Sequence, residues 1–154
     1  MKHAVVAAPL AILLVLGFKG CGSTKPPASE QASPTASQRT QVADYASLLG
    51  SLRAKGAKVE AAGEVSQPFF SVPGKVLKVN GGDVQVFEYA DAHASEAQAS
   101  LVSADGSEVG RSKVGWVGPP HFFRRDKIIA LYIGDDPTTI KALSDVLGTQ
   151  FAGK

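Results

Sequence analysis

The sequence has one cysteine among its 154 residues, so it cannot form a disulfide within the chain. A domain without disulfides must be held together by its hydrophobic core. Charged residues are also few, at 19%, whereas hydrophobic residues reach 44%, which is the composition of a globular protein. The single cysteine is a free thiol, a partner in an intermolecular disulfide or an attachment point, and its position has to decide among these roles.

The small excess of positive charge is confined to the N-terminus. Lys2 and Lys19 precede Cys21, and every acidic residue follows it. Removing residues 1–20 takes away two of the 16 Lys and Arg residues and leaves 14 of them against 14 Asp and Glu residues. A chain with balanced charge has no general attraction to nucleic acid or to an anionic membrane surface. We therefore expect no nucleic-acid partner.

The N-terminus carries a short apolar run. Residues 4–18 read AVVAAPLAILLVLGF and follow a basic start at Lys2. As a helix this run would be roughly 22 Å long at ~1.5 Å per residue, whereas a membrane-spanning helix needs about 20 apolar residues. Pro9 also interrupts it. A basic start, a short apolar run and small residues after it are typical of a secretory signal peptide, which we expect over residues 1–20.

The predicted signal peptide ends in the sequence FKGCGS, which contains Gly20 and Cys21. This pair resembles the lipobox of bacterial lipoproteins, in which a small residue precedes the cysteine. The resemblance implies that the Cys21 thiol receives a diacylglyceryl group, that residues 1–20 are cleaved off, and that the new N-terminus is acylated. It also implies an exported protein that is lipid-anchored to a bacterial membrane on its extracytoplasmic side. The alternative, if Cys21 is not lipidated, is a secreted soluble domain.

The segment after the cysteine predicts a tether. Residues 22–40 contain no Val, Ile, Leu, Met or aromatic residue and consist largely of Ser, Thr, Pro, Ala and Gln. Such a segment cannot bury enough apolar area to offset its conformational entropy, so we expect a disordered linker over residues 21–40. Residues 41–154 then form a single globular domain of common size.

The pattern of this domain predicts three helices and several short strands. Helices are expected over Gln41–Lys55 with Thr40 as its cap, over Asp91–Val102 with Ala94, Ala97 and Leu101 facing inward, and from Asp136–Pro137 to Gly148. Strands are expected over Lys58–Val65, Pro68–Val72, Val76–Val79, Val84–Tyr89, Lys113–Val117, Phe122–Phe123 and Ile128–Ile133.

Two local features organise these strands. The residues Asn80-Gly81-Gly82-Asp83 mark a tight hairpin between their flanking strands, and the wholly apolar run Ile128–Ile133 indicates a central strand. Since the connections are short, neighbouring strands should be antiparallel. We expect an α+β fold, with a mainly antiparallel sheet and two or three helices packed on one face.

Catalytic and metal-binding motifs are missing. The sequence contains no G-x-S-x-G, no P-loop and no H-E-x-x-H. His93 and His121 match no ligand spacing of a metal site. We therefore expect no metal, no other cofactor and no enzymatic activity.

The most unusual segment is residues 116–125, which surround a Pro-Pro pair. Aromatic residues combined with arginine are frequent contact hot spots. Six residues of the segment are therefore candidates for binding a protein or a small ligand: Trp116, His121, Phe122, Phe123, Arg124 and Arg125. The alternative is that alternate aromatic residues enter the core and residues 124–127 form a solvated hairpin tip. The chain is expected to be a non-enzymatic binding module, with an accessory or structural subunit of an envelope complex as the other reading.

Overall fold

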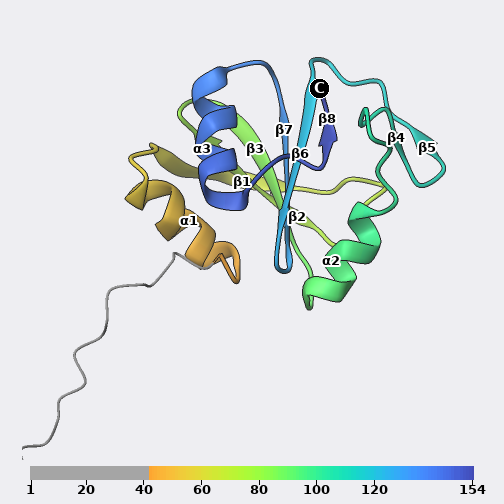
Figure 1. Cartoon of the computed structure of the whole chain (residues 1–154), viewed down its shortest axis with the longest axis horizontal. Helices are drawn as coiled ribbons and strands as arrows, with labels where there is room; N and C mark the ends of the chain where they lie inside the picture. The colour runs from red at the N-terminus through yellow and green to blue at the C-terminus, as the bar shows by residue number, and fades with distance from the viewer. Residues whose placement is uncertain (1–41) are drawn as a thin grey trace, which may run out of the picture. The chain divides into compact units, whose positions relative to one another are not determined.

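The computed structural model describes residues 42–154. In this part of the chain, three α-helices accompany a six-stranded sheet and a separate two-stranded one (Figure 1). The elements, in order, are α1 (Tyr45–Ala54), β1 (Val59–Val65), β2 (Gly74–Val79), β3 (Gly82–Glu88), α2 (Ala92–Ala99), β4 (Glu108–Val109), β5 (Ser112–Lys113), β6 (Pro120–Arg125), β7 (Ile128–Ile133), α3 (Pro137–Leu147) and β8 (Ala152–Gly153). Every neighbouring pair of strands is antiparallel. The expected α+β class is confirmed.

The six strands of the main sheet lie in the order β1-β2-β3-β7-β6-β8. β7 lies between β3 and β6 and is buried along nearly its whole length, as its apolar run predicts. The tight hairpin also forms as expected: Val79 pairs with Gly82, and Asn80 and Gly81 make the two-residue turn with φ angles of 53° and 95°. Positive φ at both turn positions matches the twist of the strands, and Asn-Gly adopts it at low cost.

Each face of the sheet carries its own hydrophobic cluster, because successive side chains of a strand point to opposite faces. In β7, Ile128, Ala130 and Tyr132 join the cluster beneath α1 and α3, whereas Ile129 and Leu131 join the cluster on the other face. Figure 1 shows α1 and α3 on one side of the sheet and α2 with the β4–β5 hairpin on the other. Two helices therefore share a face, and the third covers the opposite one.

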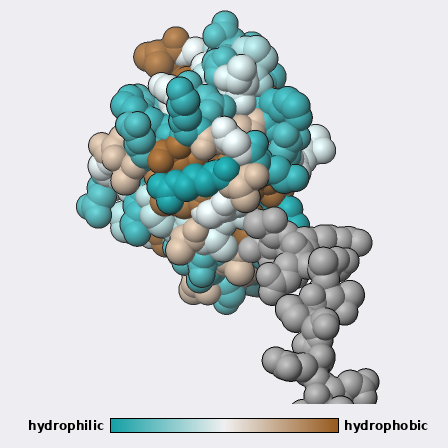
Figure 2. All heavy atoms as spheres, turned by 90° about the vertical axis from the view of Figure 1, so that its left-hand side faces the viewer, coloured by the Kyte–Doolittle hydropathy of each residue, from teal (hydrophilic) through white to brown (hydrophobic). Residues whose placement is uncertain are grey.

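The outer surface over α1 and α3 is mainly polar. Figure 2 looks at this side of the molecule and shows hydrophilic residues over most of it, with hydrophobic atoms visible between them. The core side of α3 holds Leu143, Val146 and Leu147, all of which are buried. Both helices are thus amphipathic elements that cover the sheet, as the apolar spacing in the sequence predicts.

The start of α1 differs from the prediction. The helix begins at Tyr45 and not at Gln41, and the residue that caps it is Asp44. The Asp44 carboxylate accepts the N–H of Ser47 at 2.8 Å, and the Ser47 hydroxyl accepts the N–H of Asp44 at 2.9 Å. This reciprocal pair satisfies backbone donors that the first turn leaves free. Thr40, the expected cap, lies outside the described residues. The expected cap of α3, Asp136, is confirmed, with Pro137 at its first position and Gly148 at its end.

The inner face of α2 was predicted correctly at Ala94, which is partly buried against the core, but wrongly at Ala97 and Leu101, which are exposed. The buried residues of the helix are Ser95, Gln98 and Ala99. Polar contacts hold this helix in place. The Ser95 hydroxyl donates to the backbone oxygen of Asp126, and the Gln98 amide bonds to the backbone of the segment before β2. Side-chain hydrogen bonds of this kind leave no apolar periodicity in the sequence for a pattern to detect.

Two of the expected strands are also corrected. Pro68–Val72 forms turns and bends and no strand, because Gln98 binds Ser71 N–H at 3.3 Å and the Phe69 carbonyl oxygen at 3.2 Å. The strand expected over Lys113–Val117 ends at Lys113. The chain then leaves extended pairing and forms the loop that carries Trp116.

Candidate functional site

The six residues that the sequence singled out do not share one surface. Phe122 and Phe123 are 0% and 1% exposed, and they belong to the clusters on opposite faces of the sheet. Arg125 donates from Nη1 to the Val146 carbonyl oxygen of α3 at 2.8 Å. Arg124, its neighbour on β6, points to the other face. The alternation of the strand distributes these side chains, so they do not act as one patch.

His121 is also part of the packed structure. Its side chain is 6% exposed and stacks on Tyr132, with ring centroids 6.1 Å apart. Its Nδ1 lies 2.7 Å from the Gln150 side-chain oxygen, which ties β6 to the segment before β8. Within residues 42–154, its Nε2 has no hydrogen-bond partner.

Trp116, another of the six, lies beside a cleft. Its Nε1 donates to the Gly106 carbonyl oxygen at 2.7 Å. Its ring meets Phe69 and Phe122 edge to face, with centroid separations of 5.8 and 5.9 Å. A half-buried indole held on three sides in this way has a fixed orientation.

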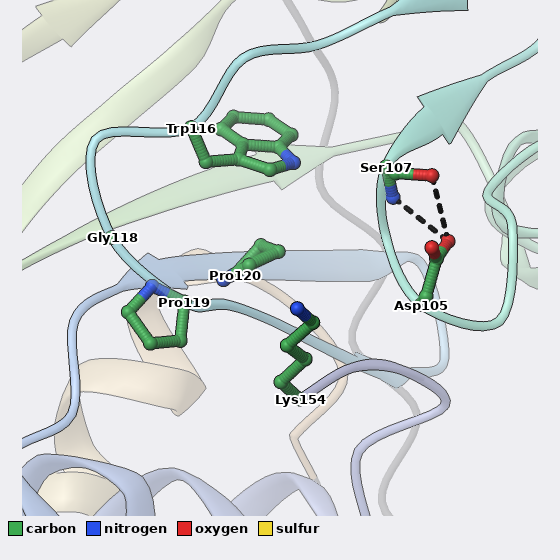
Figure 3. A pocket seen from close by; sticks show the side chains of 7 residues that line it. All are labelled: Asp105, Ser107, Trp116, Gly118, Pro119, Pro120 and Lys154. Carbon is green, nitrogen blue, oxygen red and sulfur yellow. Dashed lines mark hydrogen bonds between the residues drawn. The ribbon is translucent and has the colours of Figure 1, made fainter.

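The cleft beside Trp116 has a volume of about 280 Å³. Three separate segments build it: the turn before β4, the loop between β5 and β6, and the residue after β8. Figure 3 shows side chains from all three around one space. Its lining residues are Asp105, Ser107, Trp116, Gly118, Pro119, Pro120 and Lys154. We call this site the Trp116 cleft.

Asp105 supplies a permanent negative charge to the Trp116 cleft. The backbone N–H of Ser107, at 3.0 Å, and the hydroxyls of Ser103 and Ser107 donate to its Oδ1. These bonds stabilise the carboxylate, with the backbone bond first among them, and lower the pKa of Asp105 to about 2. All three end on Oδ1, so within residues 42–154 the Oδ2 atom has no hydrogen-bond donor.

Lys154 brings the opposite charge. Its backbone N–H donates to the Pro120 carbonyl oxygen at 3.0 Å, which fixes the residue against β6. Its side chain is exposed, and it makes no salt bridge with any residue in the described range. The side chains that line the Trp116 cleft therefore include one anion and one cation, beside an apolar wall of indole and proline rings.

Sequence reasoning identified only Trp116 in this site. Neither Asp105 nor Lys154 was among its candidate residues. The available signal was the Pro119-Pro120 pair beside the only tryptophan, but it could not indicate which distant residues fold against that pair. Cys21, the residue predicted to carry lipid, lies outside the described residues.

No protein-family model matches the chain, and no match was found among curated proteins or solved structures. Within residues 42–154, no three His, Cys, Asp or Glu side chains come together as a metal site would require. No helix in that range is long and apolar enough to cross a membrane.

Proposed function

We propose that this chain is a membrane-tethered bacterial lipoprotein whose folded domain is a non-enzymatic binding module on the extracytoplasmic side. The observation that carries the binding role is the Trp116 cleft, where fixed polar groups and an apolar wall meet. Small-ligand sites combine the same two features. The support for the location is the apolar run that ends at Gly20-Cys21 and the tether-like composition that follows it.

The lipid anchor follows from simple energetics. Each methylene group of an acyl chain contributes ~0.8 kcal/mol when it is buried in the bilayer, and stable attachment takes more than one chain. A diacylglyceryl group on Cys21 together with an acylated N-terminus provides several chains. The linker of residues 22–40 then lets the domain work at a distance from the membrane surface.

The chemistry of the Trp116 cleft favours binding over catalysis. A carboxyl group with a pKa of about 2, such as Asp105, stays ionised at neutral pH and is poorly suited to proton transfer there. The Ser107 hydroxyl donates to Asp105 at 2.9 Å. A nucleophilic serine would instead donate to a base such as histidine.

The anchor is tested by growing cells with labelled palmitate and isolating the full-length protein. We expect the label in the wild-type chain and in Ser23→Ala, a matched control beside the cysteine, but not in Cys21→Ser. We also expect Cys21→Ser to leave the membrane fraction. Equal labelling of the wild type and Cys21→Ser contradicts the anchor, and a wild-type chain without label supports a secreted or uncleaved protein.

The binding role is tested with the purified full-length protein in detergent. The chain has one tryptophan, and it lines the cleft, so its emission reports directly on that site. A panel of amino acids, monosaccharides, organic acids and polyamines should include at least one class that changes the emission saturably. If no class does so, and calorimetry also detects no binding, the small-ligand module is excluded.

A further inference from the structure

We propose that the Trp116 cleft binds a small zwitterion, of the class of a free α-amino acid with an apolar side chain. This inference rests on the proposed binding role and names its ligand class. The ligand ammonium group would bind the free Oδ2 of Asp105, and the ligand carboxylate would bind the Lys154 ammonium group. The apolar side chain would lie against Trp116 and the proline rings.

The charges of the cleft are the first argument. Asp105 and Lys154 both line it, and neither has an ion-pair partner within the described range. A ligand with only one charge would be attracted by one of these residues and repelled by the other. A zwitterion satisfies both charges at once, and charge-assisted hydrogen bonds to each end would orient it.

The size of the cleft is the second argument. Its volume of about 280 Å³ is just below the range of about 300–1,000 Å³ that is usual for drug-sized ligands. A nucleotide or an oligosaccharide would extend far outside it. An amino acid or a monosaccharide fits, and the pair of opposite charges favours the amino acid.

The rigidity of the cleft is the third argument. Trp116 is held by its bond to Gly106, and Asp105 is held by the two serines around it. A Cβ atom on Gly106 would lie 2.9 Å from the Phe122 ring and 3.0 Å from the Pro120 ring, so the turn packs directly on β6. Groups that keep their positions in the free protein lose little entropy when a ligand binds.

The test measures Trp116 emission in the full-length protein with four probes: L-leucine, leucinamide, N-acetyl-leucine and glucose. L-leucine should give a saturable change. Leucinamide lacks the carboxylate and N-acetyl-leucine lacks the ammonium group, so each should bind about tenfold more weakly, the value of one charged hydrogen bond. Glucose should give no response.

Two variants assign each charge to its residue. Lys154→Ala should weaken L-leucine about tenfold, the loss of one charged hydrogen bond, and should not weaken leucinamide, whose positive charge Lys154 repels. Asp105→Asn keeps an acceptor for Ser107 and Ser103. It should weaken L-leucine but not N-acetyl-leucine, whose negative charge Asp105 repels. Val117→Ser, at an exposed position next to Trp116 that does not line the cleft, is the matched control and should bind like the wild type.

The failure modes are distinct. If L-leucine and leucinamide bind equally well to the wild-type protein, the zwitterion inference is wrong. If glucose binds and L-leucine does not, the inference is also wrong, although a binding module remains. If the wider panel also gives no signal, the proposed binding function fails with it. The comparison of probes on the wild-type protein needs no variant to fold.

Discussion

Replacing Tyr89 with Phe should stabilise the protein. Tyr89 is 4% exposed and belongs to the cluster that contains Phe70, Phe87 and Phe122. Its hydroxyl is buried, and within residues 42–154 no hydrogen-bond partner lies in reach. Burial also raises the pKa of Tyr89 far above its usual value, so the group stays neutral and in need of a partner.

The size of the effect follows from the missing hydrogen bond. A buried hydroxyl without a partner costs about 1–3 kcal/mol, and the substitution removes that cost while keeping the ring. We expect the free energy of unfolding to rise by about 1 kcal/mol, at the lower end of that range because the surrounding chain can relax. With a urea slope of about 1–3 kcal/mol/M, the unfolding midpoint should rise by about 0.5 M.

Tyr132→Phe is the matched control, since it makes the same chemical change with the opposite consequence. The Tyr132 hydroxyl accepts the backbone N–H of Asp136 at 3.3 Å, just before α3. Losing this acceptor should lower the free energy of unfolding by about 0.5–1.5 kcal/mol. Urea titrations followed by circular dichroism measure both variants. A Tyr89→Phe protein less stable than the wild type would refute the reasoning, because it would mean that the hydroxyl makes a favourable bond.

Two further predictions concern acid and the docking of α2. Hydrogen bonds from the hydroxyls of Thr139 and Thr138 lower the pKa of Asp136 to about 2, below the value of about 3.9 in an unfolded chain. This group therefore stabilises the fold above about pH 4, and the stabilisation should be lost as the pH falls towards 2. Unfolding measured from pH 2 to 6 should be less acid-dependent in Asp136→Asn, and an unchanged profile would contradict this. Gln98→Ala should lower the free energy of unfolding by about 1–3 kcal/mol, since it leaves backbone groups near Phe69 unpaired. It should also shift Trp116 emission, because Phe69 packs on that ring; the exposed change Glu96→Gln should do neither.

Local chemistry made several elements predictable. The β2–β3 turn depends only on Asn80-Gly81, and the ends of α3 depend on Asp136, Pro137 and Gly148. The burial of β7 follows from an apolar run that no exposed strand could carry. In each case the residues that determine the structure are neighbours in the sequence, so a pattern can detect them.

Other features depend on contacts between distant residues. The face that α2 buries is set by Ser95 and Gln98, whose partners lie some 30 residues away, at Asp126 and Ser71. The Trp116 cleft joins residues 105, 107, 116, 118–120 and 154, which meet because β8 and the turn before β4 both pack beside β6. The sequence predicted residues 116–125 to form one binding patch. Strand alternation instead places Phe122 and Phe123 in the hydrophobic clusters on opposite faces of the sheet.

The most direct test of the account is the mass of the N-terminal peptide of the protein isolated from membranes. We predict that the mature chain begins at Cys21 and carries a diacylglyceryl group on the thiol and an acyl chain on the N-terminus. A chain with an unmodified Cys21 thiol, whether it still holds residues 1–20 or begins at another residue, would contradict it.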